Sequence, residues 1–96
     1  MAVIWKYQVP WKNEVPIEQS FTLKIPSGSQ VLCVQTQNDF PHVWAMVYSP
    51  NAPIEVRKFV VCNTGSDIPD SCSLAYIGTF QTARGMFVFH LFEDIT

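Results

Sequence analysis

The sequence is poor in the residues that build most metal and redox sites. It contains two histidines, His42 and His90, and three cysteines, Cys33, Cys62 and Cys72, with no Cys-x-x-Cys pair. An odd number of widely spaced cysteines argues against a secreted disulfide scaffold and offers none of the ligand spacings typical of zinc. We therefore expect no metal site, and cysteines that serve as small apolar residues in a reducing compartment.

Charged residues are also scarce. Asp, Glu, Lys and Arg make up 15% of the chain and the formal net charge is −2, whereas charged residues are about 25% of a typical soluble domain. This balance does not favour nucleic-acid binding, which requires a basic surface. Because so few charges remain to cover the surface, we expect part of it to be buried between subunits of a homo-oligomer.

Long apolar segments and helical patterns are missing as well. No run approaches the roughly 18 apolar residues that a membrane-spanning helix needs, and Met1–Ile4 is followed at once by Trp5 and Lys6 rather than by the apolar core of a signal peptide. No stretch of ten residues shows the apolar spacing of a capped helix. The sequence therefore predicts a cytoplasmic protein without membrane segments and with at most one short helix, within 63–74.

What the chain does contain is the alternation of apolar and polar residues that is typical of β-strands, interrupted by Pro, Gly and Asn. This pattern predicts one all-β domain over residues 1–96, a compact antiparallel sandwich or small barrel of about seven strands. The segments between them, including Trp11–Pro16 and Asn63–Ser73, are predicted to be loops. The predicted strands are Val3–Val9, Ile17–Ile25, Gln30–Gln37, His42–Tyr48, Ile54–Cys62, Tyr76–Thr82 and Met86–Phe92.

The last two of these strands form the most pronounced pattern. The short break between them contains Arg84 and Gly85 and fits a tight hairpin connection. Both faces of Met86–Phe92 are apolar except at His90, so we expect both faces to be covered. The strand is then either a central core strand or one whose second face meets another subunit. We expect His90 to bond to a backbone carbonyl, with a role as general base as the alternative.

Six segments of the chain, in their order and spacing, resemble an uncharacterised family of short all-β accessory proteins of tailed phages and prophages. The resemblance covers nearly the whole chain and carries no activity or functional residue with it. It implies a small phage protein made in the bacterial host cytoplasm, where such proteins often inhibit host machinery or sequester small host signals. The segments are Ile4–Tyr7, Val34–Gln37, Val43–Val47, Asn63–Gly65, Tyr76–Phe80 and Phe87–Glu93.

Two glutamines and a tryptophan are candidates for a ligand site. Gln35 and Gln37 share the face of a strand that also carries Val31 and Cys33. Amide side chains there can read the hydrogen-bonding edge of a base, because each offers donors and an acceptor. Trp44, on the next strand, can stack on a ring. The alternative is that the two glutamines simply face solvent.

Two arginines complete the candidate set. Arg57 is embedded in the apolar sequence around Val56 and Phe59, and a guanidinium binds phosphate through two parallel hydrogen bonds. Arg84, at the hairpin tip, can close over the site of a neighbouring subunit. The alternative for Arg57 is an exposed edge charge that discourages aggregation.

Catalytic motifs are not found in the sequence: it has no Gly-x-Ser-x-Gly, no phosphate-binding glycine loop and no paired carboxylates in an apolar run. We therefore expect a non-enzymatic protein without a cofactor. The phage context that the resemblance implies, together with Gln35, Gln37, Trp44 and Arg57, leads us to expect that it sequesters a small anionic nucleotide, such as a host immune signal. The alternative is an inhibitor that binds a host protein through exposed aromatic anchors. The candidate anchors are Trp5, Trp11, Phe40 and Trp44; the alternative for Trp11 is that it packs its loop onto the sheet.

Overall fold

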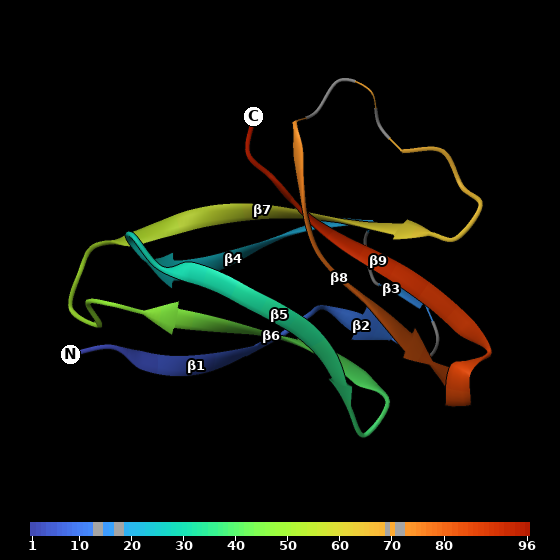
Figure 1. The fold of residues 1–96 in the computed structure, drawn as a ribbon, viewed down its shortest axis with the longest axis horizontal. Coiled ribbons are helices and arrows are strands. Elements are labelled where there is room, and N and C mark those ends of the chain that lie inside the picture. The colour runs from blue at the N-terminus through green and yellow to red at the C-terminus, as the bar shows by residue number, and fades with distance from the viewer. Residues whose placement is uncertain (13–14, 17–18, 69, 71–72) are drawn as a thin grey trace.

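The alternating segments fold into nine antiparallel strands and one 3-10 turn, η1 (Figure 1), in a computed structural model that describes residues 1–12, 15–16, 19–68, 70 and 73–96. The predicted all-β class is confirmed. Cys72 and the first two residues of the predicted strand Ile17–Ile25 lie outside the described residues. The elements are β1 (Val3–Gln8), β2 (Trp11–Lys12), β3 (Val15–Pro16), β4 (Ser20–Pro26), β5 (Gln30–Gln37), β6 (Phe40–Val47), β7 (Ile54–Asn63), β8 (Leu74–Thr82), η1 (Ala83–Gly85) and β9 (Phe87–Asp94).

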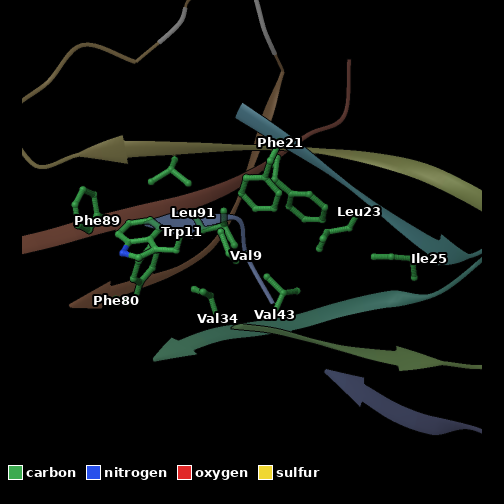
Figure 2. Close-up of a cluster of buried hydrophobic side chains, with 12 residues drawn as sticks. Val9, Trp11, Phe21, Leu23, Ile25, Val34, Val43, Phe80, Phe89 and Leu91 are labelled. Atoms are coloured by element: carbon green, nitrogen blue, oxygen red, sulfur yellow. The ribbon is translucent and has the colours of Figure 1, made fainter. Parts of the chain in front are cut away.

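Two sheets form a sandwich around a shared core. One has the strand order β1-β6-β5 and the other the order β4-β7-β9-β8, while β2 and β3 form a separate short hairpin. Each sheet turns its buried positions inward and its polar positions outward, as the period of two requires. Figure 2 shows the core cluster, which draws on both sheets and comprises Val9, Trp11, Phe21, Leu23, Ile25, Val34, Val43, Phe59, Val61, Phe80, Phe89 and Leu91.

The two sheets meet where β8 lies against β5. Gly78 of β8 sits so close to Val34 of β5 that a Cβ at position 78 would lie 2.9 Å from Val34 Cγ1 and 3.7 Å from the Val34 nitrogen. Real Cβ atoms essentially never make a contact of that length. A side chain at position 78 is therefore incompatible with the present approach of the two strands.

A β-bulge at Leu32 corrects the predicted faces of β5. The register shifts between Val31, which pairs with Ala45, and Cys33, which pairs with Trp44. Ala45 is fully buried and Trp44 is half-buried on the opposite face of β6. Val31 therefore faces the core, and the prediction that it shares a face with Cys33 is wrong, because the extra residue of a bulge reverses the alternation.

The prediction that Trp11–Pro16 is a loop is wrong at both ends, where the structure has the short strands β2 and β3. Trp11 pairs with Pro16 in the β2-β3 hairpin, and its side chain is buried rather than exposed. Figure 2 shows the indole beside Phe80 and Phe89, and its ring centroid lies 5.4 and 4.9 Å from theirs, edge to face. Such contacts stabilise a core beyond the burial of area alone, so Trp11 anchors the hairpin to the sandwich.

The closing hairpin is confirmed. β8 and β9 pair antiparallel, from Thr82 opposite Phe87 beside the turn to Leu74 opposite Asp94 at the far end. The connection through η1 requires positive φ at Ala83, Arg84 and Gly85, which costs least at the glycine. β9 is an interior strand because β7 pairs with its other edge. Its core face is buried and its outer face is half-buried, so cover of that outer face by a second subunit stays a prediction.

Substituting Gly78→Ala should lower the free energy of unfolding by about 1–3 kcal/mol, because the new methyl group overpacks the contact between β8 and β5. Urea denaturation followed by tryptophan fluorescence measures this loss. In the background Val34→Ala, which shortens the side chain that the methyl meets, the same substitution should cost less. Equal costs in the two backgrounds would contradict the close contact.

Candidate functional site

Three of the five candidate ligand residues lie on one surface, the outer face of the β1-β6-β5 sheet. Gln35 pairs with His42, Gln37 with Phe40 and Cys33 with Trp44, which places all of them on the face opposite the buried residues of β6. Gln35 and Gln37 are exposed, and Trp44 is half-buried. The structure therefore brings both glutamines and the tryptophan together.

Lys6 and His42 join this face, although the sequence did not single them out. Lys6 pairs with Trp44 from the β1 side, and its Nζ donates a hydrogen bond of 2.7 Å to Gln37 Oε1. The ring of His42 lies 6.1 Å from that of Trp44, and its Nδ1 donates to the Phe40 carbonyl at 2.9 Å. A carbonyl only accepts, so Nδ1 carries the hydrogen and Nε2 is left as an acceptor in the neutral ring.

A cleft of about 330 Å³ lies beside Gln35, between β5 and β8. Gln35 and Thr36 line it from β5, and Thr79 and Gln81 line it from β8. Two amides and two hydroxyl groups therefore converge next to the outer face. Gln35 is the one predicted ligand residue that lines this polar hollow, whose side chains can accept or donate hydrogen bonds without carrying charge.

Arg57 does not belong to this surface. It faces the interior from β7, and its Nε and Nη2 bind the two carboxylate oxygens of Glu93 on β9 as a bidentate ion pair, with the Nη2–Oε1 distance at 2.9 Å. Its Nη1 donates to the Ser29 carbonyl at 2.7 Å. The hydrogen bonds that Arg57 donates to the Glu93 carboxylate raise the pKa of the guanidinium above its usual value. With the guanidinium held this way, Arg57 fastens β7 to β9 and to the turn before β5.

Arg84 lies at the same end of the molecule as the tip of the β5-β6 hairpin. The Ala83 N–H donates a hydrogen bond of 2.8 Å to Asp39 Oδ1, which holds η1 against the β5-β6 turn. Asp39 and Asn38 both adopt positive φ in that turn, as tight hairpins require. Arg84 itself is exposed, so its side chain is available to a ligand or to a second molecule.

His90 is held by two threonines on the outer face of the other sheet. Its Nε2 lies 2.8 Å from Thr64 Oγ1 and its Nδ1 lies 2.9 Å from Thr79 Oγ1, and Thr79 in turn bonds to the Tyr76 hydroxyl. The predicted backbone carbonyl partner is wrong, because the threonines on β8 and after β7 reach both ring nitrogens. With both nitrogens bonded, the ring joins three segments, β9, β8 and the segment after β7.

Cys62 is the cross-strand neighbour of His90 on β7. Burial raises the pKa of the Cys62 thiol above its usual value, and a protonated thiol is a poor nucleophile. Within the described residues, no group of three or more His, Cys, Asp or Glu side chains is placed to hold a metal ion. In the same part of the chain, none of the helices has the length and apolar character needed to cross a membrane.

A second, larger groove of about 750 Å³ lies between β3, the start of the β7-β8 loop and the start of β9. None of the five candidate ligand residues lines it. Its described polar lining consists of amides and hydroxyls without a charged side chain. The lining residues are Val15, Pro16, Gln19, Asn63, Thr64, Ser66, Met86, Phe87, Val88 and Phe89.

A family model described as a domain of unknown function (DUF7352) matches residues 1–96. No curated protein and no solved structure matches the chain. The geometry of the outer face and of the cleft beside it therefore carries the functional argument.

The ion pair between Arg57 and Glu93 should stabilise the fold. Replacing Glu93→Gln should lower the free energy of unfolding by about 2 kcal/mol, because the half-buried guanidinium loses a charged acceptor. Urea denaturation measures this change. Lys58→Met, an exposed position on the same strand, is the control and should stay within about 0.5 kcal/mol of the parent protein. Equal effects at the two positions would contradict a structural ion pair.

Proposed function

The chain belongs to the DUF7352 family, and we propose that it is a non-enzymatic protein that binds a small anionic nucleotide on the outer face of its β1-β6-β5 sheet. One observation carries the proposal. Lys6, Gln35, Gln37 and Trp44 lie on a single solvent-facing surface, so a cation, two amides and an aromatic ring are presented together.

Each group supplies one part of nucleotide recognition. The ring of Trp44, with His42 beside it, offers a surface on which a base can stack. Gln35, at the rim of the cleft, can donate to and accept from the edge of that base. Lys6 supplies the positive charge that attracts a phosphate, and it does so as a flexible point charge.

Lys6 takes the role that the sequence suggested for Arg57. The guanidinium of Arg57 is already bound by Glu93 and by the Ser29 carbonyl, whereas the Lys6 ammonium is exposed and has one amide partner. An ammonium carries three donors. It can therefore contact a phosphate while it keeps its hydrogen bond to Gln37.

In this proposal the protein sequesters its ligand without turnover. The phage context implied by the sequence resemblance makes a host immune signal the expected ligand and the host cytoplasm the expected compartment. Arg84, exposed at the neighbouring hairpin tip, is expected to reach a ligand held by another subunit of a homo-oligomer.

A second candidate function is inhibition of a host protein. Trp5 and Phe40 are exposed and lie at the edge and at the end of the same sheet, where they can act as aromatic anchors. Trp11 is no longer a candidate, because it is buried in the core. The test is recovery of a stoichiometric host protein on the immobilised chain. Recovery with the parent protein that is lost with the Trp5→Ala and Phe40→Ala variants would favour this function over nucleotide binding.

Nucleotide binding should depend on Trp44. Isothermal titration of the protein with mononucleotides, cyclic mononucleotides and cyclic dinucleotides should identify at least one ligand. Trp44→Ala should then weaken its binding by about 5- to 150-fold, since stacking on an aromatic side chain contributes about 1–3 kcal/mol per base.

Met46→Ala is the matched control, because Met46 lies two residues along the same strand and face as Trp44 and has no ring to stack. It should leave the affinity within about threefold of the parent, as expected for a position outside the contact. Absence of heat with every nucleotide, or equal losses for the two variants, would refute the proposed site.

A further inference from the structure

β1 leaves one of its two backbone edges unpaired. It forms a ladder with β6 on one side, and on the other side none of the strands in the described part of the chain pairs with it. In Figure 1, β1 lies at the lower rim of the molecule with β6 next to it. Such an edge presents free N–H and C=O groups that can pair with another strand.

In the two main sheets, the other described edges are protected and that of β1 is not. The edges of β5 and β8 lie against each other, and β4 carries exposed Lys24 and ends in Pro26, both of which discourage pairing. On β1, Val3, Ile4 and Trp5 remain 36%, 57% and 40% exposed. The lone charge of β1, Lys6, is drawn across the sheet by its hydrogen bond to Gln37 and does not block the edge.

The register with β6 decides which backbone groups point outward. The Val9 N–H donates to the Pro41 carbonyl, and this contact continues the register in which Tyr7 pairs with Val43. In an antiparallel ladder the hydrogen-bonded pairs alternate. The odd-numbered residues therefore bond to β6, and Ile4 and Lys6 direct their N–H and C=O groups to the free edge.

We propose that a second copy of the chain pairs with this edge, antiparallel β1 to β1, around a two-fold axis at Trp5. In this register, Ile4 lies opposite the partner subunit's Lys6 in a hydrogen-bonded pair, and Trp5 lies opposite the partner subunit's Trp5 in the closer, non-hydrogen-bonded pair. A two-fold contact repeats every pair. The Ile4–Lys6 bonds therefore occur twice.

This register is the one that the charges of β1 select. A shift that sets Lys6 against its own copy would oppose two like charges, which destabilises cross-strand pairs. A shift that sets Ile4 against its own copy places Lys6 opposite the partner subunit's Ala2, beyond the end of β1. The register at Trp5 instead pairs two aromatic rings, an arrangement that stabilises adjacent strands.

The dimer joins two three-stranded sheets into one of six strands with a continuous outer face. It differs from an interface on the outer face of Met86–Phe92, because β9 is paired on both edges and offers only side chains to a neighbour. The dimer forms without ligand, so its test is independent of the proposed nucleotide binding.

The test compares two charge variants at one exposed position. In Ile4→Glu the new carboxylate faces the partner subunit's Lys6, and in Ile4→Lys two ammonium groups face each other. Sedimentation equilibrium of the full chain without ligand should show a dimer for the parent, and the dissociation constant should be at least about tenfold higher for Ile4→Lys than for Ile4→Glu. High salt should reduce this difference.

Thermal unfolding of both variants checks that the fold is intact, since Ile4 is more than half exposed. A monomeric parent protein would overturn the proposal. So would equal weakening by the two variants, which would indicate either apolar association without this register or pairing of Ile4 with its own copy.

Discussion

The close approach of β8 to β5 at Gly78 and Val34 is the constraint on which the rest of the molecule depends. Because position 78 has no Cβ, the edge of one sheet can rest on the other and close the sandwich along one side. Next to this contact lies the cleft at Gln35, lined by residues of both strands. The same approach brings η1 to the β5-β6 turn, where Ala83 binds Asp39.

Closure of the sandwich along one side also determines which strand edges are left unpaired. Since β5 and β8 cover each other, the free edges of the two sheets are β1 and β4, and only β4 is blunted by charge and proline. Lys6 links the two proposals for this protein. Its side chain crosses the outer face to Gln37, where a phosphate can reach it, and its backbone lies on the edge where a second copy can pair.

The strands could be predicted from the sequence, but the face on which each residue of β5 lies could not. Alternation in segments such as Phe21–Ile25 reports burial on one side of a sheet directly, and the structure agrees there. The bulge at Leu32 changes that alternation without any signal from Gly or Pro, so the face of Val31 could not be deduced. Trp11 was missed because a two-residue strand is too short to show a period.

The candidate site was predictable in part for the same physical reasons. Gln35, Gln37 and Trp44 come together because neighbouring strands of a hairpin share a face. The partner of Arg57 could not be foreseen, because Glu93 is 36 residues away in the sequence and only the β7-β9 pairing brings them together. Lys6 was missed for a similar reason, since the pairing of β1 with β6 is not encoded locally.

The most direct test of nucleotide binding on this face is the chemical-shift map of the ¹⁵N-labelled protein titrated with a nucleotide that binds it. If the nucleotide binds on the outer face of the β1-β6-β5 sheet, the largest shifts should fall on the Trp44 indole N–H, the Gln35 side-chain amide and the backbone around Lys6. Shifts confined to Asn63, Thr64, Ser66 and Met86–Phe89, which line the larger groove, would contradict nucleotide binding on this face.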